Sequence, residues 1–262
     1  MLLACITHED SAMTHWHASN AQSAPAAQWP THTHWSVVLT AGDPAAPGAR
    51  MALEELCRAY WYPVYAYVRR RGYAWPDAED LTQSFFLHLF ETQALAAATP
   101  ERGRFRAFLR GAADRFIVDE WRHGNALKRG RRTAFLSWEG LHAEERYSRE
   151  TDAGLTAERL FDRSWAENLL QRVLDRLKGE LAVEGRASLF EALKDRLLGA
   201  VDGRPYGDLA QQLGTTHAAL QKTVQRLRVR FCESLRLEIA QTVAPPDNVE
   251  DELRYLMVVL SA

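Results

Sequence analysis

The sequence has few cysteines and no long apolar run. Its 262 residues include only Cys5, Cys57 and Cys232, which form neither an even disulfide set nor the spacing of metal ligands. Because Cys57 and Cys232 fall on apolar stripes of predicted helices, we interpret them as small buried hydrophobic residues. No segment approaches the run of about 20 apolar residues that a membrane span needs. The first six residues lack the basic start of a signal peptide, so we expect a cytoplasmic protein.

The motifs that mark common enzyme sites are also missing. There is no phosphate-binding glycine loop, no Gly-x-Ser-x-Gly turn and no His-Glu-x-x-His zinc motif. We therefore expect neither an enzyme nor a bound cofactor. The N-terminal histidines have no acid or cysteine at helical spacing, so we interpret them as part of a polar tail rather than a metal site. These histidines are His15, His17, His32 and His34.

The net charge is small, but the charges are unevenly distributed. The chain has 32 Lys and Arg against 34 Asp and Glu, which gives a net charge of −2. Basic residues dominate 102–132 and 222–236, whereas acidic residues gather in 139–162 and 247–252. Basic patches attract DNA, while a balanced total weakens independent, non-specific binding. This distribution predicts a protein that reaches DNA through a partner.

Apolar residues recur at steps of three and four through most of the chain, and strand alternation is absent. The sequence therefore predicts an all-α fold with two helical domains joined by a polar linker. Pro63 should kink or divide the first long helix, at about 47–72. The predicted parts are a disordered tail 1–34, a first domain 35–123, a linker 124–158, a second domain 159–243, and a C-terminal part 244–262 that contains an amphipathic helix.

The most diagnostic pattern lies in the second domain, at residues 206–237. Ala210 is small where two helices would cross closely, and Gly214 has the freedom that a tight turn requires. Thr215 or Thr216 can cap the second helix. An apolar stripe buries one side of that helix, which leaves a polar, basic side that can enter a DNA major groove. The stripe is Leu220, Val224 and Leu227, and the predicted DNA-binding residues are Thr216, His217, Ala218, Gln221, Lys222, Gln225 and Arg226. A helical hairpin with a solvated basic face is the alternative.

Two helices of the first domain present faces that suit macromolecular partners. The helix from Asp77 to Phe90 has an acidic face with one exposed leucine, Leu87, which fits protein docking. Acids at a helix N-terminus explain part of this pattern equally well. The next helix gathers arginines beside an aromatic residue, as single-stranded or distorted DNA requires. These residues are Arg106, Arg110, Asp114 and Trp121, with Arg122 further round. Packing of Trp121 on a neighbouring helix is the alternative for that residue.

These stretches resemble a family of bacterial transcription proteins. The runs Ala52-Leu-Glu-Glu-Leu-Cys, Asp77-Ala-Glu-Asp-Leu-Thr-Gln and Phe105-Arg-Ala-Phe-Leu are similar to sigma domain two of extracytoplasmic-function (ECF) sigma factors. Residues 206–231 resemble the helix-turn-helix of sigma domain four. His34-Trp-Ser-Val-Val-Leu resembles the opening of a subgroup with N- and C-terminal extensions. The resemblance covers about residues 34–240 and implies a sigma factor that binds core RNA polymerase and directs promoter-specific transcription initiation.

The resemblance implies roles for the matching positions. Residues on the acidic helix would engage the coiled coil of the polymerase β′ subunit: Asp77, Glu79, Asp80 and Gln83, with Leu87 on the same face. Residues of the following helix lie where the family melts and reads the minus-ten element: Arg106, Arg110, Asp114, Asp119 and Arg122. Residues at the start of the helix after Gly214 would read the minus-thirty-five element: His217, Ala218, Gln221 and Lys222. Asp114 departs from the Asn that is frequent in the family, and a carboxylate cannot donate a hydrogen bond to a base. We expect Asp114 to pair with Arg110 one turn away.

A stand-alone helix-turn-helix transcriptional regulator is the main alternative, and it predicts tight operator binding by the protein alone. It leaves the acidic helix of the first domain unexplained. The hypothesis of a sigma factor is compatible with regulation by an anti-sigma factor or by a kinase. Thr82 is a candidate residue for phosphorylation. The C-terminal helix has an apolar stripe that either packs on the second domain or regulates by covering a binding face. The stripe is Leu253, Leu256, Met257 and Leu260.

Overall fold

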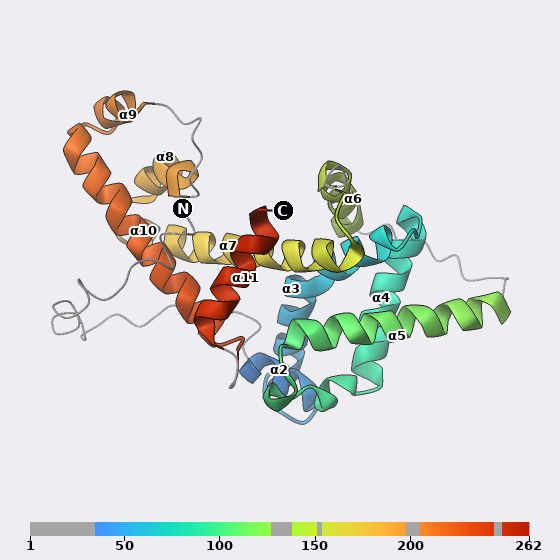
Figure 1. Cartoon of the computed structure of the whole chain (residues 1–262). Helices are drawn as coiled ribbons and strands as arrows, with labels where there is room; N and C mark the ends of the chain where they lie inside the picture. Colours follow the sequence, from blue (N-terminus) through green and yellow to red (C-terminus); the bar gives the residue numbers. More distant parts are fainter. Residues whose placement is uncertain (1–34, 127–137, 151–153, 198–204, 244–247, 262) are drawn as a thin grey trace. The chain divides into compact units, whose positions relative to one another are not determined.

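The computed structural model describes residues 35–126, 138–150, 154–197, 205–243 and 248–261 (Figure 1). Every regular element in these residues is helical, which confirms the predicted all-α class. None of the described helices is long and apolar enough to cross a membrane. The predicted tail 1–34, with its four histidines, lies outside the described residues. The chain divides into two compact units, and each is described by itself.

Among the described residues, the N-terminal unit contains 35–126, 138–150, 154–168, 240–243, 248 and 258–261. Its helices surround α3, and two short 3-10 helices connect α4 to α5. The elements are α2 (Trp35–Gly42), α3 (Ala49–Arg70), α4 (Trp75–Glu91), η1 (Ala94–Ala97), η2 (Pro100–Arg102), α5 (Phe105–Ala126), α6 (Trp138–Glu150) and the beginning of α7 (Ala157–Val183).

Helix α3 is the centre of this unit. Residues 62–68 of its second half are all buried, on every side of the helix. A helix that is buried all round needs neighbours on each face, and α2, α4 and α6 all contact α3. Pro63 lies inside α3 without dividing it into two elements.

Helix α4 lies close to its predicted boundaries, Asp77 to Phe90. Helix α4 begins with Pro76 in its first turn, where the missing N–H of proline costs no hydrogen bond. From the sequence we expect the buried arc of α5 to consist of Phe105, Phe108, Leu109, Ala112 and Phe116, and of these Phe105, Leu109 and Phe116 are buried. Its apolar arc is completed by Ala113 and Ile117, whereas the predicted members Phe108 and Ala112 are only partly buried.

The C-terminal unit contains residues 169–239 and 249–257 among those described. Its core is apolar, and the buried carboxylate of Glu238 pairs with the partly exposed Arg176 at 3.1 Å. Arg236 and Glu250 form a second ion pair, at 3.2 Å, and Leu253 and Leu256 are buried. The beginning of the C-terminal helix therefore packs within this unit. The elements are the rest of α7, α8 (Ala187–Leu197), α9 (Tyr206–Gln212), α10 (His217–Ala240) and the beginning of α11 (Val249–Ser261).

The structure differs from the predicted linker 124–158. Residues 138–150 form α6, which contacts α3, and the helix that begins at Ala157 starts inside the N-terminal unit. Hydrophobic periodicity missed α6 because ion pairs supply many of its contacts with neighbouring helices. The cysteines also differ in part. Cys57 is a free thiol, and both Cys57 and Cys232 are only partly buried.

Candidate nucleic-acid and protein interfaces

Helices α9 and α10 are joined by the turn 213–216. Gly214 has a φ of +62°, which is the left-handed conformation that the sequence predicts for this position. The backbone N–H of Thr215 donates to the carbonyl of Ala210 at 2.9 Å. The hydroxyl oxygen of Thr216 accepts a hydrogen bond from the Ala219 N–H at 3.2 Å, so Thr216, not Thr215, caps α10.

The two sides of α10 differ as predicted. Leu220, Val224 and Leu227 are buried, and Leu209 and Ala210 of α9 are buried with them. The predicted DNA-binding residues of this helix are all exposed: Thr216, His217, Ala218, Gln221, Lys222, Gln225 and Arg226. The first turns of α10 therefore carry an exposed polar face with two cationic side chains.

The aromatic ring of Tyr206 supports one end of this face. Its ring meets that of His217 edge-on, with centroids 5.6 Å apart. The guanidinium carbon of Arg196 lies 4.0 Å from the centroid of the Tyr206 ring, a cation–π contact. These contacts restrict the His217 side chain to one side of α10.

Two downstream arginines of α10 are used inside the unit. We interpret Arg228 and Arg230 from the sequence as DNA-backbone contacts, but both are engaged with protein. Arg228 donates to the carbonyl of Arg196 at 2.9 Å. Arg230 binds Glu180 at 2.9 Å and Glu184 at 3.0 Å, so it joins α10 to α7. These acids lie 46 to 50 positions away in sequence, which is why sequence spacing did not reveal them.

The predicted polymerase face on α4 is mostly exposed. Asp77, Asp80 and Gln83 are exposed, and Leu87 is 56% exposed. Partial burial and the neighbouring charges of Glu79 and Asp77 raise the pKa of Asp80. Three carboxylates thus share one short stretch of helix, where they concentrate negative charge beside an exposed apolar side chain.

Two other side chains of α4 point inward. Glu79 is only 3% exposed, and its carboxylate lies 3.4 Å from the side-chain amide nitrogen of Gln83. Thr82 is fully buried, and its hydroxyl donates to the carbonyl of Ala78 at 2.7 Å. A kinase would therefore have to open α4 before it could reach the Thr82 hydroxyl.

The two arginines at the start of α5 are held by α7. Arg106 is 6% exposed, and its Nε lies 3.7 Å from Oδ1 of Asp162. The same guanidinium lies over the ring of Trp165, 4.4 Å from the centroid. Arg110 donates from Nη1 to Oδ2 of Asp162 at 3.0 Å. The carboxylate of Asp162 therefore contacts both of the predicted DNA-binding arginines at the start of α5.

The predicted pairing of Asp114 with Arg110 is wrong. Asp114 accepts a hydrogen bond from the hydroxyl of Tyr67 in α3 at 2.7 Å, and another from Arg71, the residue that follows α3. Burial, together with the Asp114 carboxylate, raises the pKa of Tyr67 to about 12 even though Arg71 opposes the shift. Asp114 binds Tyr67 and Arg71, and Arg110 binds Asp162. These tertiary contacts replace the pairing of Asp114 with Arg110 within the helix, because such a pairing is intrinsically weak.

The other end of α5 is open. Trp121 is 63% exposed, so among the described residues it does not pack in the way that the alternative interpretation requires. Val118 is exposed beside it. Asp119 and Arg122 form an exposed ion pair at 3.5 Å. This end therefore offers an aromatic face next to a cation that solvent reaches.

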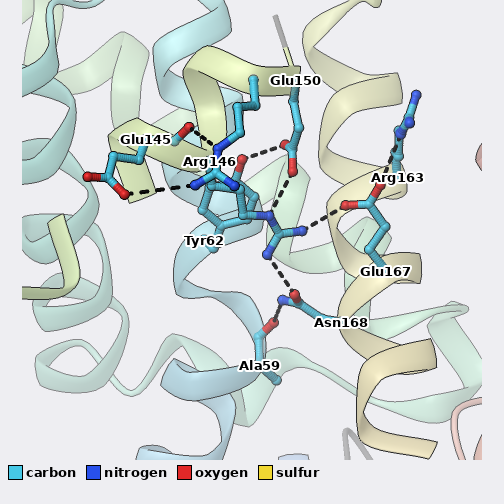
Figure 2. Close-up of polar contacts among 9 residues, drawn as sticks. Ala59, Tyr62, Glu145, Arg146, Glu150, Arg163, Glu167 and Asn168 are labelled. Atoms are coloured by element: carbon cyan, nitrogen blue, oxygen red, sulfur yellow. Dashed lines mark hydrogen bonds and ion pairs between the residues drawn. The ribbon is translucent and has the colours of Figure 1, made fainter. Parts of the chain in front are cut away.

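Sequence reasoning missed a polar network that docks α6 on α3 and α7 (Figure 2). The guanidinium of Arg146 lies 3.8 Å from the centroid of the Tyr62 ring. It donates to Glu150 at 2.7 Å, to Glu167 at 2.8 Å and to Asn168 at 3.0 Å (Figure 2). All three guanidinium nitrogens of Arg146 thus donate hydrogen bonds, and with the Tyr62 ring these contacts tie α3, α6 and α7 together.

A second polar cluster joins α3 and α6. Arg69 donates from Nε and Nη2 to the two oxygens of Glu144, at 2.9 and 2.8 Å. This bidentate geometry is the strong form of an ion pair. The hydroxyl of Tyr65 donates to Glu144 as well. Burial alone would raise the pKa of Glu144, but the hydrogen bonds from Arg69 and Tyr65 hold it below its usual value.

Comparison with known families connects one part of this architecture to transcription. Residues 56–126 match the family model of sigma-70 region 2. The match runs from α3 through α5, so it includes both the acidic face of α4 and the arginines of α5. It supports a sigma-70 family member with a role in transcription initiation. A search of curated proteins and a search of solved structures found no match.

Proposed function

We propose that this chain is an ECF-type sigma factor with N- and C-terminal extensions that binds core RNA polymerase and directs promoter-specific transcription initiation. The observation that carries the proposal is the match of residues 56–126 to sigma-70 region 2. In this proposal the chain works in the cytoplasm, has no catalytic site of its own, and lends specificity to the polymerase that it joins.

Helix α4 is the proposed contact with the polymerase β′ coiled coil. The exposed residues Asp77, Asp80, Gln83 and Leu87 provide an apolar contact with an acidic rim. Such a combination suits a protein interface, where a desolvated apolar side chain supplies affinity and rim charges supply orientation. Glu79 takes part indirectly, because its buried carboxylate lies beside the side chain of Gln83.

Helix α5 is the proposed reader of the minus-ten element. Trp121 offers a ring on which an unstacked base can pack, and Arg122 lies next to it with Asp119 as its partner. Arg106 and Arg110 would neutralise phosphates. Asp114 would act through Arg71 and Tyr67, which it holds in place.

Helix α10 is the proposed reader of the minus-thirty-five element. Its exposed face starts at the Thr216 cap, where helix N-termini commonly approach the bases of a major groove. His217, Ala218, Gln221 and Lys222 would face base edges. Gln225 and Arg226 follow one turn later and would contact the DNA backbone.

Run-off transcription with core polymerase tests the proposal. We expect transcripts from a subset of a broad promoter pool only when both the chain and core polymerase are present. Asp80→Lys should abolish core binding and transcription, while Glu54→Lys, which reverses an exposed acid of α3, should change neither. A chain that binds core but yields no transcript from the pool would count against the proposal. Tight operator binding without polymerase would instead favour the stand-alone regulator.

A further inference from the structure

The beginning of α7 brings two carboxylates to the arginines of the N-terminal unit. Asp162 is buried and contacts Arg106 and Arg110 at 3.7 and 3.0 Å. Glu158, one helical turn earlier on α7, lies 4.0 Å from Nη2 of Arg71. Two anionic groups on one helix therefore face three guanidinium groups contributed by α5 and the end of α3.

Local contacts fix this part of α7 in place. The hydroxyl oxygen of Thr156 accepts a hydrogen bond from the Arg159 N–H at 3.3 Å, which caps the helix. Arg70 donates from Nε to the carbonyl of Leu155 at 2.6 Å. At the other end of the segment, Asn168 binds both Arg146 and the carbonyl of Ala59 (Figure 2). The segment also buries the apolar side chains of Leu160, Phe161 and Trp165, and the Phe161 ring stacks on that of Tyr60 in α3. Its displacement therefore has to expose these apolar side chains as well as break the polar contacts.

The coverage by α7 is selective. Arg106 is 6% exposed beneath Asp162 and the ring of Trp165, whereas Trp121 at the far end of the same helix is 63% exposed. Asp80 and Leu87 on α4 are exposed as well. Of the surfaces that the proposed function assigns to this unit, α7 thus covers the phosphate-binding end of α5 and leaves the others open.

We propose that residues 157–168 of α7 are an internal competitor of promoter DNA. The carboxylates of Asp162 and Glu158 occupy the guanidinium groups that DNA phosphates take over once the segment is displaced. The inference rests on the proposed function, because that function assigns Arg106 and Arg110 to DNA. It adds a regulatory step, in which DNA binding by α5 requires release of α7.

Neutralising Asp162 is the direct test. The probe is a fluorescent single-stranded oligonucleotide of mixed sequence, and the dissociation constant is measured against salt for the full chain. Asp162→Asn should bind about fivefold more tightly. Its plot of log affinity against log salt should steepen by about 1.4, which corresponds to two additional phosphates. Adding Arg110→Ala to Asp162→Asn should remove much of the gain.

Glu54→Gln is the matched control, because it makes the same change in net charge at an exposed ion pair on α3. We expect its affinity for the oligonucleotide to stay within about twofold of that of the unaltered chain. An equal gain in Glu54→Gln and Asp162→Asn would contradict the competition, since a general charge effect would then explain both.

Hydrogen exchange on the unaltered chain gives a second readout that does not depend on how well the variant folds. Saturation with the oligonucleotide should accelerate amide exchange in residues 157–168, and unchanged exchange would overturn the proposal. Unchanged affinity of folded Asp162→Asn in a chain that still supports promoter-specific transcription would contradict the competition alone. Acceleration in 157–168 without any transcript in the presence of core polymerase would contradict the sigma proposal and leave the competition standing.

Discussion

Single residues of the N-terminal unit are held by carboxylates that come from distant parts of the sequence. Glu144 lies 75 positions from Arg69, and Asp162 lies 52 positions from Arg110. Helical periodicity relates residues only three or four positions apart, so it cannot reveal partners at such separations. The sequence therefore predicted the candidate residues of α5 but not their contacts. Asp114 illustrates the point, because its expected partner within the helix lost to Tyr67 and Arg71.

Glu144→Gln should destabilise the protein, because it breaks the bidentate pair with Arg69. We expect a loss of about 1.5 kcal/mol in the free energy of unfolding at pH 7, measured by urea denaturation. The pKa of Glu144 is lowered in the folded state, so its contribution is complete above the ordinary value of 4.5 and is lost as pH falls below it. The difference between the two proteins should therefore shrink in acid. Glu145→Gln, at an exposed neighbour, should have little effect.

The turn before α10 allows a second test at the scale of one residue. Gly214 has positive φ, and a Cβ added there would meet no atom within 4 Å, so Gly214→Ala adds backbone strain without a clash. We expect a loss of about 1 kcal/mol in unfolding free energy. Gly207 in α9 also has open space around a Cβ but no positive φ. Gly207→Ala should leave stability unchanged or raise it slightly. Equal losses in both variants would contradict the assignment of strain to Gly214.

At the scale of elements, the sequence predicted most of the helices and their boundaries, because apolar spacing, caps and turn residues are local signals. Helix α10 is the clearest case, since its buried stripe and the left-handed Gly214 both follow from spacing alone. Helix α6 was missed because its buried apolar side chains are few, Ala143 and Tyr147 among those described, and Arg146, Glu150 and Glu144 supply much of its docking. The periodicity of apolar residues predicts which side of a helix is buried, but it does not predict ion pairs between helices.

Arg146→Ala tests how α6 is held. The substitution removes one cation that binds three side chains and covers the Tyr62 ring, so we expect a loss of about 2 kcal/mol. Amide exchange in residues 142–150 should rise more than in α4. Arg149→Ala removes an exposed arginine of the same helix and should cost less than about 0.5 kcal/mol. Similar effects of the two variants would show that Arg146 does not hold α6.

The face of α10 gives a prediction about binding. Lys222→Ala removes an exposed cation from the first turns of α10, and we expect about a fivefold loss in affinity for promoter DNA carrying the minus-thirty-five element. Arg254→Ala removes an exposed cation of α11 and should leave that affinity nearly unchanged. The comparison requires a promoter identified by run-off transcription. A loss of the same size in Arg254→Ala would mean that total charge, and not the face of α10, governs binding.

For the molecule as a whole, the charge distribution and the family match both favour DNA binding that depends on the polymerase. The net charge of −2 disfavours independent DNA binding, and the segment that matches sigma-70 region 2 contains the acidic face of α4. Arg106 and Arg110 are engaged by Asp162, which lowers the attraction of the isolated protein for phosphates further. A protein built in this way is expected to read promoters in the company of the polymerase.

The affinity of the full chain for one cognate promoter fragment, measured with and without core polymerase at the same salt concentration, tests this claim most directly. We predict weak binding by the chain alone and binding at least about a hundredfold tighter in the complex with core. The gain should disappear in Asp80→Lys, whose α4 face no longer matches its partner. Equally tight promoter binding in the absence of core polymerase would contradict the account.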